Sequence, residues 1–205
     1  MNLNKSISYK AARIISTIFV PPSFTLTTFI YFALTLETEP GKKIITITTA
    51  LIFGFLLHIF LFVYFKKQGR LIDLDATIKE ERTIPFLISI LIYCMGFAVL
   101  MFDNINIISI AFWFCYISDT LIVVFINKYW KISVHSMGAS GSLAALIFVA
   151  GPIGSLLIII VALVGWSRIK LKCHNLYQVL AGILLGFFSS YLQIFFIVKW
   201  FGHGR

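Results

Sequence analysis

Long apolar runs separated by short polar connections restrict the fold of this chain more than any other feature of its sequence. A helix of about 20 apolar residues is long enough to cross the hydrocarbon core of a bilayer. Inside a bilayer the backbone N–H and C=O groups need internal partners, which favours helices. The predicted spans are 14–35, 44–65, 86–102, 107–127 and 176–199, with two shorter ones at 137–150 and 153–166. The sequence therefore predicts an all-α, polytopic transmembrane helical bundle of about six to seven spans.

The composition agrees with a membrane location. Apolar residues make up 60% of the chain and charged residues 12%, whereas soluble domains average about 45–50% and 25%. A chain of 205 residues suits one compact bundle, so residues 1–205 are expected to form a single integral membrane domain. The basic start of the chain runs into an apolar span without a small-residue cleavage site, which favours a retained first helix. We expect a multi-pass protein of a bacterial cytoplasmic membrane.

Alternation of the spans predicts that the loops 66–85, 128–136 and 167–175 lie on one face of the membrane. These loops carry most of the polar side chains suited to chemistry, namely Arg82, Lys131, His135, Arg168 and His174. Pro21 and Pro22 are expected to kink the first span, because proline lacks a backbone donor and clashes with the preceding turn. One face of the bundle is therefore predicted to hold nearly all of the chemistry.

The net charge of +9 points to anionic lipid or phosphate groups and not to nucleic acid, because the basic residues lie in short loops between apolar runs. Only four of the 17 Lys and Arg residues fall on the opposite face: Lys42, Lys43, Lys199 and Arg205. The positive-inside rule would place the basic face in the cytoplasm. An anion site requires cations on either side, so the orientation is left open.

Three motifs in the loops of the basic face are interpreted as one set. "DLDATIKEERTIPF" contains Arg82 and Pro85 just before a span, "KYWKISVHSMGASG" contains Ser133 and His135, and "SRIKLKCH" contains Arg168 and His174. The set resembles the type-2 phosphatidic acid phosphatase and vanadium haloperoxidase superfamily, in its membrane lipid phosphatase branch. The motifs of that superfamily are K-x6-R-P, P-S-G-H and S-R-x5-H-x3-D. The resemblance covers about residues 75–190.

The resemblance implies a metal-independent phosphatase that acts on a lipid phosphate or diphosphate. In that chemistry His174 attacks phosphorus to form a phosphohistidine, and His135 protonates the leaving oxygen. Arg82 and Arg168 hold the phosphate oxygens, and Ser133 with nearby backbone N–H groups completes the anion site. The implied substrates are polyprenyl diphosphate, phosphatidic acid or phosphatidylglycerol phosphate, with the tail among membrane lipids and helices. No cofactor and no metal are expected.

The sequence departs from the family motifs at three places. Ile132 and Val134 replace the proline and glycine of the second motif. Asp75 stands where the first motif has lysine, and Lys79 or Lys131 are the candidates for the missing cation.

The third departure is Gln178, which stands where the third motif has aspartate. Its amide carbonyl is expected to accept a hydrogen bond from His174, because residues i and i+4 share a helix face. It orients the imidazole without adding the negative charge of a carboxylate.

Other functions stay open. A catalytically degenerate protein that binds a lipid phosphate or a membrane partner is favoured by Gln178 and Asp75, and disfavoured by the retained histidines. Asp73 and Asp75 resemble a magnesium site for a prenyl diphosphate, but the loops 128–136 and 167–175 contain no second acidic cluster.

Two polar residues lie within predicted spans. Asp119 is either a functional residue or a structural partner of a lysine or arginine from a neighbouring helix. His58 is expected to be a core histidine whose hydrogen bonds are satisfied, as is usual in an apolar span.

Overall fold

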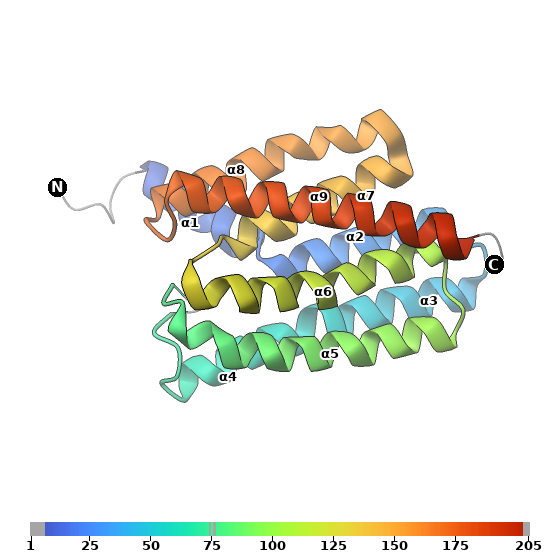
Figure 1. The fold of residues 1–205 in the computed structure, drawn as a ribbon, viewed down its shortest axis with the longest axis horizontal. Coiled ribbons are helices and arrows are strands. Elements are labelled where there is room, and N and C mark those ends of the chain that lie inside the picture. Colours follow the sequence, from blue (N-terminus) through green and yellow to red (C-terminus); the bar gives the residue numbers. More distant parts are fainter. Residues whose placement is uncertain (1–6, 74, 76, 203–205) are drawn as a thin grey trace.

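A computed structural model of the chain describes residues 7–73, 75 and 77–202, and every regular element within these residues is a helix. Five helical runs in this part of the chain are long and apolar enough to cross a membrane, and a bent pair of helices makes a sixth. The predicted all-α polytopic bundle is confirmed (Figure 1).

The bent pair consists of α1 (Ile7–Ile18) and α2 (Pro21–Leu36), which meet at an angle of 55°. Pro21 and Pro22 occupy the first positions of α2. Proline suits the first helical turn, where its missing N–H would have no intrahelical partner. The predicted kink is confirmed, and the break comes before the two prolines.

The next run joins α3 (Pro40–Thr49), the π-helical stretch η2 (Ala50–Leu56) and α4 (Leu57–Lys67). A side chain at Gly54 would meet α2, because an added Cβ would lie 2.5 Å from Thr25 Cγ2. After the loop 68–79 and the short 3-10 turn η3 (Glu80–Arg82), α5 (Thr83–Phe102) and α6 (Ile107–Tyr129) pack together. These helices form one side of the bundle.

A helical hairpin follows. α7 (Val134–Ala150) passes through the 3-10 segment η4 (Gly151–Leu157) into α8 (Ile158–Lys170), which folds back along α7 (Figure 1). Gly151 has a φ of 63°, a conformation that glycine adopts without steric cost. The two short helices predicted on either side of Gly151 and Pro152 are present as this hairpin. By its length and apolar composition, the whole segment Val134–Lys170 is one of the five candidate membrane-spanning runs.

The last helix, α9 (Leu176–Phe201), packs closely against α7. A Cβ added at Gly182 would lie 2.5 Å from the Ser133 carbonyl oxygen, and one at Gly186 would collide with the Met137 carbonyl. Small residues allow helix backbones to approach closely in membranes. α7 also packs on α2 and α8, so the helix that carries His135 lies in the middle of the bundle.

The described residues of the first loop (68–73, 75 and 77–79) and the loops 130–133 and 171–175 lie at the same end of the bundle, at the left in Figure 1. The prediction that one face gathers these segments is confirmed. The loops are shorter than predicted, because α7 starts at Val134 and α8 continues to Lys170. His135 therefore lies in a first helical turn and Arg168 in a last turn, where a cation interacts favourably with the helix dipole.

Candidate functional site

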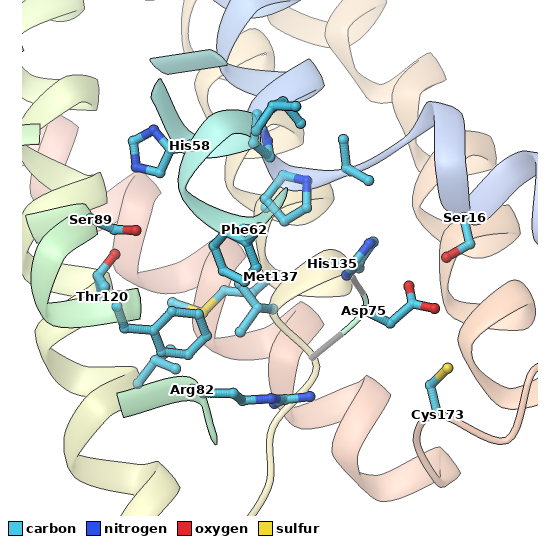
Figure 2. Close-up of a pocket in the computed structure, with 18 of the residues that line it drawn as sticks. Ser16, His58, Phe62, Asp75, Arg82, Ser89, Thr120, His135, Met137 and Cys173 are labelled. Carbon is cyan, nitrogen blue, oxygen red and sulfur yellow. The ribbon is translucent and has the colours of Figure 1, made fainter. Parts of the chain in front are cut away.

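A cavity of about 750 Å³ extends into the bundle from the start of α7 and from the loop segments around Asp75 and Cys173. Arg13, Asp75, Arg82, His135 and His174 line its loop end, whereas His58, Tyr93 and Asp119 line it further inside. Figure 2 labels Asp75, Arg82, His135 and His58 among these residues. Tyr93 follows Arg82 by eleven residues along α5, which corresponds to a depth of about 16 Å. The cavity has a charged end at the loops and a mainly uncharged interior, a shape that suits an amphiphile.

His174 lies directly before α9, and the start of that helix fixes its ring. Asn175 caps α9 by accepting from the Gln178 backbone N–H, and the Gln178 side chain reaches back to the Asn175 N–H at 3.2 Å. This reciprocal arrangement is a capping box. The same Gln178 oxygen lies 3.1 Å from Nδ1 of His174. The predicted contact between Gln178 and His174 is present.

The tautomer of His174 follows from this contact. The Gln178 Oε1 atom accepts from a backbone N–H, and an amide oxygen can only accept. Nδ1 of His174 therefore carries the proton, and Nε2 of the neutral ring has a free lone pair. No hydrogen bond to Nε2 is found among the described residues, and the side chain lines the cavity.

The surroundings of His174 keep the ring neutral. Burial is the main cause that lowers its pKa, to about 3, and the positive charges of Arg82, Lys131 and Arg168 lower it further. An imidazole with this pKa is uncharged at neutral pH, as a nucleophilic nitrogen must be.

His135 occupies the first turn of α7 and lines the same end of the cavity. Ser133 caps this helix: its Oγ accepts from the Ser136 N–H at 3.4 Å and lies 2.9 Å from the Ser136 Oγ. Nε2 of His135 is buried without a hydrogen-bond partner among the described residues. A buried polar atom without a partner is costly, so this nitrogen is suited to a ligand oxygen.

Two buried guanidinium groups lie near this end: Arg82 lines the cavity, whereas Arg168 does not. Arg82 is buried, lines the cavity and donates from Nη1 to the Ile132 carbonyl at 3.2 Å. Arg168 has no exposed surface, and its Nη1 donates to Ser16 Oγ at 2.5 Å and to Asp75 Oδ1 at 2.6 Å. Nε and Nη2 of Arg168 are buried without partners among the described residues. These two atoms form the edge of a guanidinium that binds an oxyanion bidentately.

Asp75 joins two arginines. Its second oxygen accepts from Arg13 Nη1 at 2.5 Å, on α1. Burial by itself would raise the pKa of Asp75, but the charge and hydrogen bond of Arg168, with Arg13, lower it to about 2. Figure 2 shows the Asp75 carboxylate close to His135 and Ser16. Asp75 is therefore an ionised carboxylate within a group of cations.

Arg13 and Ser16 were missed by the sequence analysis, which assigned no role to the first helix. They lie three residues apart, so they share one face of α1. A polar pair on one face of a helix that leads into an apolar span was the available signal. Their partner Asp75 lies 62 residues from Arg13, and no sequence pattern connects the two.

Three predicted phosphate-binding residues are engaged outside the cavity. Lys131 Nζ donates to the Cys173 carbonyl at 2.6 Å and so ties two loops together. Lys79 Nζ donates to the Lys128 carbonyl at 3.2 Å. Ser133 is fully buried as the cap of α7. None of the three lines the cavity. Their contacts hold the loops and the start of α7 in place.

The inner end of the cavity contains polar groups from several helices. Asp119 Oδ1 accepts from Ser189 Oγ at 2.5 Å and from Gln193 Nε2 at 3.2 Å, and no ion pair to it is found among the described residues. His58 is buried as expected and stacks on Tyr93 at 4.3 Å, but neither ring nitrogen has a partner in the described part of the chain. Within the same residues no group of three or more His, Cys, Asp or Glu side chains is placed to hold a metal ion.

The low pKa of His174 predicts how stability depends on pH. Its folded pKa is about 3 and its unfolded pKa is about 6.5, so the unfolded chain binds more protons between these values. Acidification through this window therefore destabilises the fold, by up to about 2 kcal/mol between pH 6.5 and pH 5. Unfolding in detergent at pH 7.5 and pH 5 should show a larger loss for the wild type than for His174→Gln. Equal losses in the two proteins would contradict a neutral buried His174.

Comparison of the chain with protein-family models, with curated proteins and with solved structures gives no match.

Proposed function

We propose that this protein is a membrane-embedded lipid phosphatase of the type-2 phosphatidic acid phosphatase kind, which acts through a phosphohistidine without a metal. One observation carries the proposal. His174 is held neutral by its surroundings, with Nδ1 donating to Gln178 and Nε2 free, at the end of a cavity that His135 and Arg82 also line. An oriented nucleophile, a second histidine and buried guanidinium groups are the parts that phosphoryl transfer requires.

The first step forms the phosphoenzyme. The Nε2 lone pair of His174 attacks phosphorus, and the bond between phosphorus and the lipid oxygen breaks. His135 donates a proton to that oxygen, so the lipid leaves as an alcohol. Arg82 and the free edge of Arg168 stabilise the negative charge on the non-bridging oxygens in the transition state.

The second step releases phosphate. A water molecule attacks the phosphohistidine, His135 accepts its proton, and the bond between phosphorus and Nε2 breaks. His174 returns to its neutral form, since the electron pair of that bond returns to the ring. Gln178 keeps the ring oriented throughout, because its oxygen is itself held by the cap of α9.

The interior of the cavity would receive the hydrophobic part of the substrate. Phe62, Phe86, Val123 and Met137 line it between the charged end and Asp119. Such a lining buries apolar surface favourably, which supports an amphiphilic substrate over a small soluble phosphate.

A second candidate function is lipid phosphate binding without turnover. The contact that favours it is the ion pair of Asp75 with Arg168, which leaves Arg168 without exposed surface. In a binding protein of this kind His174→Ala would keep its affinity for the lipid phosphate, because no attack on phosphorus takes place.

Phosphate release from lipid phosphates in detergent tests the proposal, with and without chelator. We expect release in both conditions, a loss of at least about 10³-fold in His174→Ala, and a loss of about 10²–10⁴-fold in His135→Ala. Tyr177→Phe is a matched control, since Tyr177 lies in the same turn of α9 and is 75% exposed. Absence of release from phosphatidic acid, phosphatidylglycerol phosphate and polyprenyl diphosphate, with lipid binding retained, would favour the second function.

Substitution of Gln178 tests its orienting role. Gln178→Ala should lower kcat by about 10–10² with little change in KM, because an unoriented ring loses reactivity while the phosphate contacts remain. Gln178→Asp should leave activity flat or lower, because the shorter side chain cannot reach both the Asn175 N–H and the His174 ring. A large gain of activity in Gln178→Asp would show that the glutamine is an impairment of an ordinary phosphatase site.

A further inference from the structure

The Asp75 carboxylate occupies donors that an anionic ligand would otherwise use. One oxygen lies 2.6 Å from Arg168 Nη1 and the other 2.5 Å from Arg13 Nη1. Asp75 also lines the loop end of the cavity together with Arg13 and His135, and Figure 2 shows Asp75 beside His135. A carboxylate that bridges two guanidinium groups at this position takes the place of an oxyanion.

The donors next to Asp75 are partly occupied by its carboxylate. On Arg168, only Nε and Nη2 are without partners in the described residues. A guanidinium edge of two N–H groups matches two oxygens of one phosphoryl group. A second phosphoryl group would have to take the Arg13 and Arg168 donors from Asp75. On the Asp75 side of the cavity, this arrangement therefore favours one phosphoryl group over two.

Electrostatic repulsion by the Asp75 carboxylate also favours a ligand with a single phosphoryl group. Asp75 is ionised at neutral pH, because Arg168 holds its pKa near 2 against the effect of burial. Its repulsion of a bound anion grows in proportion to the charge of that anion. A phosphate monoester carries about −1.5 to −2 at pH 7, and a diphosphate carries more. The carboxylate therefore penalises a diphosphate more than a monophosphate.

We infer that Asp75 is a specificity-determining residue, which reserves the site for lipids with a terminal phosphate monoester and excludes lipid diphosphates. Phosphatidic acid and phosphatidylglycerol phosphate belong to the accepted class, and polyprenyl diphosphate belongs to the excluded one. The lipid class rests on the proposed phosphatase function, whereas the preference of the site among anions does not.

The experiment compares two ligand pairs in the full-length protein in detergent. Binding of inorganic phosphate and of pyrophosphate is measured by calorimetry, and phosphate release is measured from phosphatidic acid and from polyprenyl diphosphate. Asp75→Asn removes the charge and keeps the shape of the side chain. Glu80→Gln is the matched control, because it removes one carboxylate close to the same loop, at an exposed position outside the cavity.

We expect the wild type and Glu80→Gln to bind phosphate more tightly than pyrophosphate. Asp75→Asn should raise the affinity for pyrophosphate about 10–100-fold and that for phosphate clearly less. The ratio of release rates, diphosphate lipid to monophosphate lipid, should rise by a similar factor.

A second variant tests the inference if Asp75→Asn does not fold, since this substitution removes the carboxylate that neutralises the buried charge of Arg168. Arg13 is 46% exposed and tolerates replacement better. Arg13→Gln leaves the Asp75 charge less neutralised, so the ratio of pyrophosphate to phosphate affinity should fall about tenfold.

Unchanged ratios in both variants, or a wild type that binds neither anion, would overturn the inference. Absence of lipid turnover together with the predicted shifts in anion binding would instead remove the phosphatase function and leave the role of Asp75 in place.

Discussion

The buried guanidinium of Arg168 is the constraint on which the rest of the site depends. A charge without exposed surface is costly unless it is paired and hydrogen-bonded. The chain meets this requirement with Ser16 from α1 and Asp75 from the loop before α5. Arg168, on α8, thus connects the first helix with Asp75. The geometry of both histidines is set within this frame.

Two of the three departures from the motifs of the resembled family change the charges of the proposed site. Where a family member would have an aspartate, Gln178 provides a neutral hydrogen-bond acceptor for His174. Where a lysine would stand, Asp75 provides a carboxylate that two arginines hold. One negative charge is thereby absent beside the proposed nucleophile, and one is present beside the arginines proposed to bind phosphate. Under the proposed function, His174 would depend on burial and orientation more than on a neighbouring anion.

Local patterns in the sequence were sufficient for the helices and for one contact of the site. The helical hairpin followed from Gly151 and Pro152, and the contact of Gln178 with His174 followed from their spacing of four residues. Contacts between distant segments could not be predicted in this way. Arg13 and Asp75 are brought together only when α1 packs against α8, and Lys131 is directed to the Cys173 carbonyl by the fold of two loops. The exact start of α7 depended on the cap at Ser133, which placed His135 on a helix.

The most direct test of the account is to trap the covalent intermediate. The protein is mixed with phosphatidic acid that carries a radioactive phosphate, quenched in alkaline denaturant, in which phosphohistidine survives, and digested. The account predicts label on the peptide that contains His174 and none in His174→Ala. Rapid phosphate release without label on this peptide, or equal label in His174→Ala, would contradict it.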